Sequence, residues 1–367
     1  MKKVMLVFGT RPEAIKMCPL VKELMSRPEQ FETVVCVTGQ HREMLDQVLQ
    51  IFEVVPKYNL SIMEKEQTLF TITRKILERI ETVLEEEKPD IVLVHGDTST
   101  TFVTALAAFY KRIPVGHVEA GLRTNNIYSP YPEEFNRQAV GIVAKYHFSP
   151  TEAAKSNLLK EGKSEKDIFV TGNTAIDALK TTVRSEYSNE ILDWAQDSKL
   201  IVLTAHRREN LGEGMKQIFR AISRVVEERE DIKVIYPVHM NPQIGELANQ
   251  MFKSERIKLI PPMDVIDFHN ILSRAYLVLT DSGGIQEEAP ALGKPVLVMR
   301  DTTERPEGVE AGTLKLVGTE EENIYNWFIK LLDDPQAYKE MAMAKNPYGD
   351  GTASKQIVDV LEKDELL

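Results

Sequence analysis

Short apolar runs alternate with amphipathic helical patterns along the whole chain of 367 residues. The first apolar run covers residues 4–8, and the longest helical pattern covers residues 67–88. This alternation is typical of β-α-β units, in which helices connect neighbouring parallel strands. It therefore predicts an α/β fold, with parallel sheets covered by helices on both faces.

The same pattern starts again in the second half of the chain. A strand expected at residues 199–204 is followed by the basic loop His206-Arg207-Arg208, much as residues 4–8 are followed by Gly9-Thr10-Arg11. A chain of this length is also too long for one typical core. We expect two doubly wound, Rossmann-like domains facing across a cleft, residues 1–172 and 173–351, with ligands at the carboxyl ends of the strands.

The charge balance excludes some classes of partner. The chain has 45 basic and 56 acidic residues, a formal net charge of −11, which argues against nucleic acid or an anionic membrane. The two cysteines, Cys18 and Cys36, have no metal-binding spacing, which suits a reducing cytoplasm. The apolar start is too short for a signal peptide, and no run is long enough to span a membrane.

A phosphate site is expected at residues 275–289. An apolar strand is followed by the turn Asp281-Ser282-Gly283-Gly284, after which a helix begins. The start of a helix presents backbone N–H groups and a positive dipole end, and glycine allows a ligand to approach. Glu288 lies one turn beyond Gly284, where a carboxylate could bind ribose hydroxyls. The alternative is an ordinary strand–helix connection.

Three acidic residues are candidates for chemistry in the first domain. Asp97 and Glu119 follow neighbouring predicted strands, so both carboxylates should lie at one edge of the sheet. Glu133 begins a helix after Tyr131-Pro132. Asp97 could instead be a helix N-cap, and Glu133 could be a first-turn acid favoured by the helix dipole. Glu119 has no capping pattern around it.

Cationic residues follow other strands of the predicted sheets. An arginine side chain binds phosphate oxygens through two parallel hydrogen bonds, although most basic residues only solvate the surface. The candidates are Arg11, Lys16, His206, Arg207, Arg300 and Arg305.

Familiar metal and cofactor motifs are missing from the sequence. There is no Asp-x-Asp pair and no His-Glu-x-x-His, and Gly212-Glu213-Gly214 lacks the third glycine of a dinucleotide fingerprint. Neither metal-dependent nor nicotinamide-dependent chemistry is therefore favoured.

Several longer motifs follow one another in order. They are Gly9-Thr10-Arg11-Pro12-Glu13-Ala14-Ile15-Lys16, Thr38-Gly39-Gln40-His41, His95-Gly96-Asp97-Thr98, His117-Val118-Glu119-Ala120-Gly121-Leu122-Arg123, Tyr131-Pro132-Glu133-Glu134, His206-Arg207-Arg208-Glu209-Asn210, residues 281–289 and Asn346-Pro347-Tyr348-Gly349-Asp350-Gly351. With these motifs the chain resembles the bacterial non-hydrolysing UDP-N-acetylglucosamine 2-epimerases, over residues 1 to about 361.

The resemblance implies a fold like that of the GT-B glycosyltransferases, with a C-terminal helix, about residues 352–367, returning to the first domain. It implies interconversion of UDP-N-acetylglucosamine and UDP-N-acetylmannosamine in a homodimer, with no metal or redox cofactor. Catalysis would then fall to Asp97, Glu119, Glu133 and His206, and UDP binding to Arg11, Lys16, Phe268, Ser282, Gly283, Gly284, Glu288 and Arg305.

The resemblance also implies a second site, at which the substrate UDP-N-acetylglucosamine acts as an activator. Its residues would be Gln40, His41, Arg207 and His239. Glu43 stands where the resemblance implies glutamine.

Three other functions share parts of this pattern. A GT-B glycosyltransferase would use the same phosphate turn but pass the sugar to an acceptor. A hydrolysing epimerase would release UDP and free N-acetylmannosamine. A non-catalytic nucleotide-sugar sensor would not need the acids. The three acids grouped in the first domain favour the epimerase.

Overall fold

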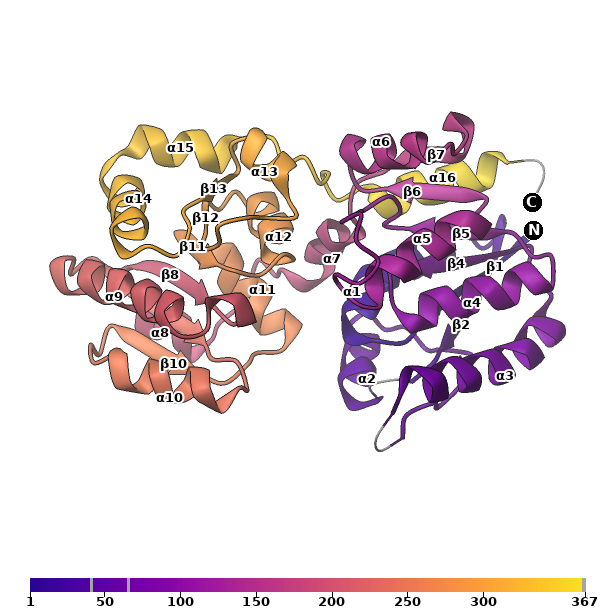
Figure 1. Ribbon diagram of the computed structural model, residues 1–367, viewed down its shortest axis with the longest axis horizontal. Coiled ribbons are helices and arrows are strands. Elements are labelled where there is room, and N and C mark those ends of the chain that lie inside the picture. The colour runs from indigo at the N-terminus through magenta and orange to yellow at the C-terminus, as the bar shows by residue number, and fades with distance from the viewer. Residues whose placement is uncertain (40–41, 65–66, 365–367) are drawn as a thin grey trace. The chain divides into compact units, whose positions relative to one another are not determined.

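The computed structural model describes residues 1–39, 42–64 and 67–364, and the chain divides into two compact units (Figure 1). The first unit consists of Met1–Thr181 and Tyr348–Leu367, and the second of Thr182–Pro347. These limits differ from the expected boundaries, after residues 172 and 351. The reason is that helix α7 (Thr174–Thr182) is hydrogen-bonded to the segment after Tyr348, for example from the amide of Ser354 to the carboxylate of Asp177 at 2.8 Å.

The described part of the first unit contains a seven-stranded parallel sheet in the order β3-β2-β1-β4-β5-β6-β7. Apolar side chains on one face of this sheet pack against α1, α2 and α16, and those on the other face pack against α3 and α4. The strands are β1 (Lys2–Phe8), β2 (Phe31–Val37), β3 (Tyr58–Asn59), β4 (Ile91–His95), β5 (Val115–Val118), β6 (Tyr146–Ser149) and β7 (Ile168–Val170). The other helices are α1 (Arg11–Met25), α2 (Arg42–Ile51), α3 (Leu69–Glu87), α4 (Ser99–Tyr110), α5 (Glu133–Val143), α6 (Glu152–Lys160), the short η1 (Glu165–Asp167) and α16 (Ala353–Lys363).

The second unit repeats this design with a parallel sheet in the order β10-β9-β8-β11-β12-β13. Its strands are β8 (Lys199–Thr204), β9 (Ile232–Pro237), β10 (Ile257–Ile260), β11 (Leu277–Thr280), β12 (Val296–Val298) and β13 (Leu314–Leu316). Its helices are α8 (Glu190–Ala195), η2 (Arg208–Asn210), α9 (Glu213–Glu228), α10 (Pro242–Met251), α11 (Val265–Arg274), α12 (Ile285–Ala291), α13 (Pro306–Glu310), α14 (Glu321–Asp333) and α15 (Pro335–Met343).

Both sheets have the strand order of a Rossmann-like fold, so the expected fold class is confirmed. In each unit the strand order reverses beside the first strand, between β1 and β4 and between β8 and β11. In doubly wound folds, ligands bind outside the carboxyl ends of the strands, at the place where the strand order reverses. The loops that follow these strands are therefore where the candidate residues should be sought.

Helix α16 is held at both ends by residues that are distant in the sequence. The carboxylate of Asp177 accepts hydrogen bonds from the amides of Ala353 (3.2 Å) and Ser354 (2.8 Å). At the other end, the ammonium group of Lys2 donates to the carbonyl oxygens of Leu361 and Glu362 at 2.7 and 2.9 Å. These contacts satisfy backbone groups that helix ends leave unpaired. Figure 1 shows α16, in yellow, among the indigo and magenta elements of the first unit.

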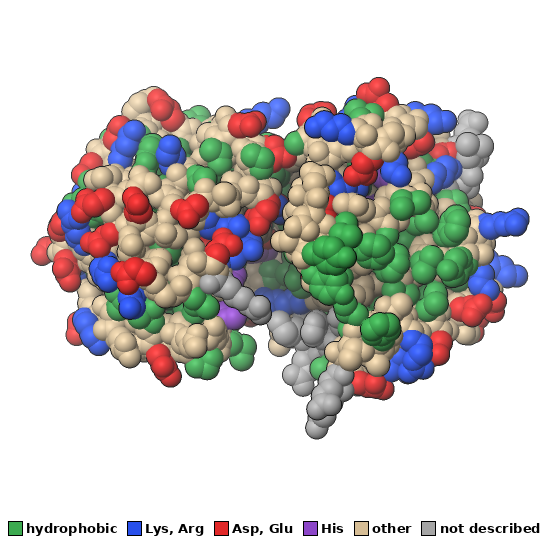
Figure 2. Space-filling model, viewed as in Figure 1, with side chains coloured by type: hydrophobic (Ala, Val, Ile, Leu, Met, Phe, Trp, Pro, Cys, Tyr) green, Lys and Arg blue, Asp and Glu red, His purple; other side chains and the backbone are tan. Residues whose placement is uncertain are grey.

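The first unit also exposes an apolar surface on α4 and α5. Phe109 is 54% exposed, Phe135 46% and Ile142 75%, and the ring of Phe102 meets that of Phe135 at 5.5 Å. Figure 2 shows hydrophobic side chains, in green, gathered on this face of the unit. Contiguous apolar patches of this kind mark interaction surfaces.

Among the described residues, no helix is long and apolar enough to cross a membrane.

Candidate active site

Glu119 directly follows β5 and is held in a constrained conformation. Its φ of 64° is in the left-handed region, which is uncommon for a residue with a side chain. Its carboxylate is mostly buried and pairs with the ammonium group of Lys16 from α1. Asn173 donates a hydrogen bond to the same oxygen at 3.0 Å. The structure thus brings Glu119 and Lys16 together. Asn173 is not among the residues predicted from the sequence, where it is only the first residue of the expected second domain.

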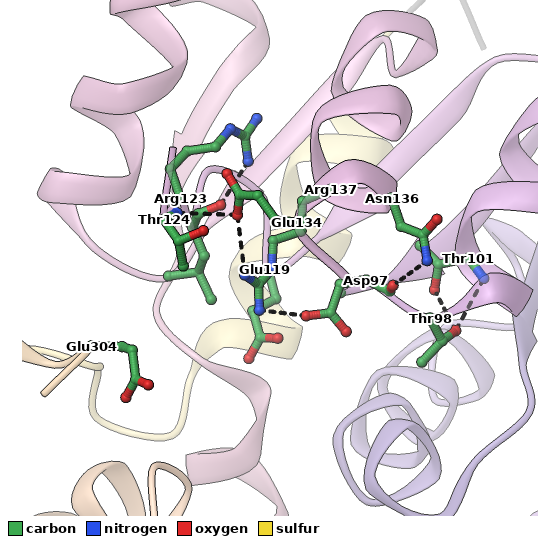
Figure 3. Close-up of polar contacts among 12 residues, drawn as sticks. Asp97, Thr98, Thr101, Glu119, Arg123, Thr124, Glu134, Asn136, Arg137 and Glu304 are labelled. Carbon is green, nitrogen blue, oxygen red and sulfur yellow. Dashed lines mark hydrogen bonds and ion pairs between the residues drawn. The ribbon is translucent and has the colours of Figure 1, made fainter. Parts of the chain in front are cut away.

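Asp97 follows β4 and forms an ion pair with Arg137 of α5, with 2.5 Å between its Oδ2 and the guanidinium (Figure 3). The carbonyl oxygen of Asp97 accepts a hydrogen bond from the side chain of Asn136 at 2.8 Å. The alternative role as an N-cap is wrong, because Thr98 caps α4 by accepting from the amide of Thr101 at 3.2 Å. The carboxylate of Asp97 therefore lies at the carboxyl edge of the sheet without a capping role.

Glu133 and Glu134 are neighbours in different environments. Glu133 is the first residue of α5 and is half-buried. Glu134 is fully buried and accepts hydrogen bonds from the amides of Thr124 (3.0 Å) and Asn125 (3.1 Å), as Figure 3 shows for Thr124. Burial raises the pKa of Glu134, but its hydrogen bonds and the charge of Arg137 outweigh this and lower the pKa. Glu134 therefore fixes the loop before α5, which leaves Glu133 as the candidate for chemistry.

A buried acid, Glu13, connects the two loops at the strand-order reversal of the first unit. Its carboxylate accepts from the amides of Gly9 (3.0 Å) and Thr10 (2.8 Å) and from the hydroxyls of Thr98 (2.7 Å) and Thr101 (3.2 Å). Burial raises the pKa of Glu13, while these bonds oppose the shift. Because Arg11 directly follows Thr10 and Asp97 directly precedes Thr98, Glu13 fixes the backbone that carries both residues. The spacing Thr10-x-x-Glu13, a capping box, is the sequence signal for this role.

Three histidines lie in the neighbouring strands β4, β5 and β6. His95, His117 and His147 are all buried, and His117 is paired in register with His147 on the neighbouring strand. Burial lowers the pKa of His95 to about 4, of His117 to about 3 and of His147 to about 4. These rings are therefore neutral near pH 7 and cannot act there as cations.

In the second unit, His206 and Arg207 follow β8, and Asp281 follows the neighbouring strand β11. The oxygen Oδ2 of Asp281 accepts from the amides of His206 and Arg207, both at 2.8 Å. The ring of His239 stacks on the ring of His206, with centroids 5.4 Å apart. Two residues assigned to the activator site, Arg207 and His239, thus lie beside His206. The other two, Gln40 and His41, are outside the described residues.

The turn after β11 lies beside two arginines. A Cβ atom built on Gly283 would be 3.8 Å from a guanidinium nitrogen of Arg207 and 4.0 Å from one of Arg305. We call Ser282, Gly283, Gly284, Arg207 and Arg305 the candidate anion site. Helix α12 begins after Gly284, as expected, although the amide of Ser282 already donates to Thr280 at 2.9 Å.

Two further UDP-binding candidates lie on helices of this unit. Glu288 on α12 has its Oε2 3.5 Å from Nε2 of His269. Phe268 on α11 is partly buried against the core of the second unit. In the first unit, Arg11 is the first residue of α1 and is half-buried.

Arg300 does not join the candidate anion site. Its side chain is buried, donating to Glu209 at 2.6 Å and to both carboxylate oxygens of Glu304 at 2.7 and 3.2 Å. It therefore ties the loop after β8 to the loop after β12. Arg305 is supported in turn by Glu287 of α12, which pairs with its Nε.

Groups of three or more histidine, cysteine, aspartate or glutamate side chains that could hold a metal ion do not occur in the described parts of the chain.

The protein has two Rossmann-like units. One carries acids at its strand ends, and the other carries a glycine turn beside two arginines. Together they define the class: an enzyme that acts on a nucleotide sugar, with a GT-B-like fold. The family model for UDP-N-acetylglucosamine 2-epimerase matches residues 22–362. The chain belongs to this family and is an isomerase.

Individual relatives agree over nearly the whole length of the chain. The UDP-N-acetylglucosamine 2-epimerase of Bacillus subtilis is 62% identical over 360 residues, which cover 98% of this chain and 94% of that protein. The crystal structure of a putative UDP-N-acetylglucosamine 2-epimerase from Listeria monocytogenes has a TM-score of 0.95 and 56% identity, covering 99% of this chain and 96% of that one. The Neisseria meningitidis UDP-GlcNAc 2-epimerase bound to UDP-GlcNAc has a TM-score of 0.88 and 49% identity, covering 99% and 100%.

Proposed function

We propose that the chain inverts C2 of UDP-N-acetylglucosamine reversibly, giving UDP-N-acetylmannosamine, through elimination and re-addition of UDP. The observation that carries this proposal is the mostly buried Glu119–Lys16 pair at the carboxyl edge of the first sheet, with Asp97 following the neighbouring strand. A Neisseria relative bound to UDP-GlcNAc supports the choice of substrate.

The proton on C2 of the sugar is not acidic while UDP is attached, because no carbonyl group stands next to it. As the bond between C1 and the UDP oxygen breaks, UDP leaves with the electron pair and positive charge develops at C1. A carboxylate can stabilise that charge and remove the C2 proton, so that a C1=C2 double bond forms. The intermediate is 2-acetamidoglucal.

The reverse steps complete the epimerisation. A proton returns to the opposite face of C2, and the UDP oxygen attacks C1. Because removal and return use opposite faces, two proton carriers are needed, and Asp97, Glu119 and Glu133 are the candidates. The leaving diphosphate needs cationic groups and hydrogen-bond donors. We assign this task to Arg11, Lys16, His206, Arg305 and residues 282–284, with Glu288 on the ribose and Phe268 near the uracil.

The activator site is a further part of this proposal. Arg207 lies beside Gly283, and the ring of its neighbour His206 stacks on that of His239. A second UDP-N-acetylglucosamine bound by Arg207 and His239 would therefore lie close to the diphosphate in the candidate anion site. Gln40 and His41 would complete that site.

The test is proton NMR of UDP-N-acetylglucosamine with the protein in D₂O. We expect deuterium at C2 and a mixture of both epimers with UDP still attached, because the C2 proton exchanges with solvent through the acids. A product that keeps its C2 hydrogen would refute elimination. Free N-acetylmannosamine with released UDP would instead indicate the hydrolysing reaction, and transfer to an added sugar acceptor would indicate a glycosyltransferase.

We also propose that the chain forms a homodimer through the apolar surface of α4 and α5. Phe102 and Phe109 are seven residues apart on α4, as are Phe135 and Ile142 on α5, so each pair lies on one helix face. A second copy of the same surface would remove these side chains from water, since a two-fold interface is self-complementary.

Substitution of Phe135 and Ile142 by aspartate should convert the dimer to a monomer, because burying two carboxylates without partners is unfavourable. Sedimentation or light scattering should give twice the 41.7 kDa chain mass for the parent and a single chain mass for the variant. Val55→Asp is the matched control, because Val55 is also exposed but lies outside α4 and α5. A monomeric parent, or an unchanged mass in the double variant, would contradict this interface.

The expected setting is the cytoplasm, where the product would supply N-acetylmannosamine units for a cell-surface polysaccharide. Cys18 and Cys36, both buried and unpaired, suit a reducing compartment.

A further inference from the structure

Asp281 is a fully buried carboxylate at the strand-order reversal of the second unit. Strands β8 and β11 are parallel neighbours, with Thr204 opposite Thr280, so the residues that follow them meet. Besides the amides of His206 and Arg207, Oδ2 of Asp281 accepts from the side-chain amide of Asn210 at 3.2 Å. One oxygen of this carboxylate therefore holds three donors of the loop after β8.

The second oxygen of Asp281 faces the imidazole of His206. Oδ1 is 3.3 Å from Nδ1 of His206 and has no hydrogen-bond partner in the described part of the chain. A buried carboxylate oxygen needs a donor, and a histidine Nδ1 can supply one only if that nitrogen carries the proton. The ring of His206 is held further by the stacked ring of His239.

We infer that Asp281 is the positioning residue for His206: it keeps a proton on Nδ1 and leaves Nε2 as the nitrogen that exchanges a proton with the ligand. This inference rests on the proposed function for its catalytic meaning, because His206 is there assigned to the leaving diphosphate. Asp281 itself would touch no substrate. Its contribution is the tautomer and orientation of the ring, together with stabilisation of the imidazolium when Nε2 is protonated.

The charges around His206 explain why this ring needs a carboxylate. Burial is the main cause that lowers the pKa of His206, and the charges of His239 and Arg207 lower it further. Asp281 is the group that opposes them. Tyr236 of β9 faces the same region, since its hydroxyl donates to the carbonyl of Ala205 at 2.6 Å. Without Asp281, His206 would be protonated less readily, just when a leaving diphosphate needs a cation.

The test uses protein labelled with ¹⁵N-histidine, because long-range ¹H–¹⁵N NMR distinguishes the two histidine tautomers. His206→Asn identifies the signals of His206. In the parent we expect the Nδ1–H tautomer. In Asp281→Asn the carboxamide can turn an N–H toward Nδ1, so the Nε2–H form should appear and the pKa of His206 should fall. We expect kcat to fall about ten-fold or more, with the Kd for UDP changing less.

Asn210→Ala is the matched control, because it removes a donor to Oδ2 and a bond to the carbonyl of Met299 but keeps the carboxylate. We expect its His206 to keep the Nδ1–H form. An Nε2–H tautomer in the parent, or an unchanged tautomer in Asp281→Asn, would overturn the inference. If Asp281→Asn does not fold, the tautomer of the parent still decides the question. The NMR measurement needs no substrate, so its result stands apart from the proposed epimerase reaction.

Discussion

Glu119→Gln is expected to lower kcat by about 10²- to 10⁴-fold, the usual contribution of a general acid or base. The amide can still accept a hydrogen bond from Asn173, but it can neither exchange the C2 proton nor stabilise charge at C1. The φ of 64° at this position is set by the backbone, so the substitution adds no strain to it. Affinity for UDP should change little, because the cationic groups assigned to the diphosphate, including Lys16, are all retained.

Steady-state kinetics and calorimetry with UDP would measure the two quantities separately. Asp97→Asn and Glu133→Gln should behave like Glu119→Gln. Glu134→Gln is the matched control for Glu133, because Glu134 is buried and bonded to backbone amides. Its substitution should lower the thermal stability. Parent-like turnover in all three acid variants would refute the assignment of these residues to catalysis.

Acidification is expected to destabilise the first unit well before its carboxylates are all protonated. His95, His117 and His147 have pKa values lowered from 6.5 to about 4, 3 and 4 by burial. As the pH falls below 6.5, the unfolded chain binds protons that the folded unit does not, so stability is lost. Each histidine contributes about 1.4 kcal/mol per pH unit, so the three together contribute roughly 4 kcal/mol per unit between pH 6 and 5. That loss is comparable with the total stability of many domains.

The two tryptophans allow the units to be followed separately, because Trp194 and Trp327 are both in the second unit. Urea denaturation at pH 7, 6 and 5 should show the transition in circular dichroism moving to lower urea more than the transition in tryptophan fluorescence. His147→Gln should weaken this pH dependence, whereas the exposed His239→Gln should not. If His147→Gln has the same pH dependence as the parent, buried histidines are not its cause.

The alternation of apolar runs was enough to predict the fold class, because the spacing of apolar residues directly reflects which faces are covered. The strand expected at residues 199–204 is β8 at the same residues, and the long helical pattern at residues 67–88 is α3 (Leu69–Glu87). The unit boundaries were harder to predict. They depend on tertiary hydrogen bonds, such as those that Asp177 accepts from the amides of α16, which leave no periodic signal in the sequence.

The candidate site was predictable where a residue's position in the fold decides its role. Glu119 follows β5 and Lys16 lies on the helix that follows β1, and the structure brings their side chains together. The sequence could not show which of two similar residues would bind a ligand and which would pair with acidic side chains of the protein. Arg300 and Arg305 both follow β12, yet Arg300 is buried between Glu209 and Glu304, and only Arg305 reaches Gly283. The roles of Glu13 and Asp281 in holding neighbouring loops were not predicted either, because these roles depend on burial.

The return of α16 to the first unit has a consequence for how the protein is made. Side chains of this helix, including Ile357, Val358 and Leu361, belong to the core that also contains β1 and α1. A ribosome synthesises residues 182–347 before it reaches them, so the second unit can close while one sheet face of the first is still only partly covered. Nascent chains are therefore exposed to premature association through that face until translation has passed α16.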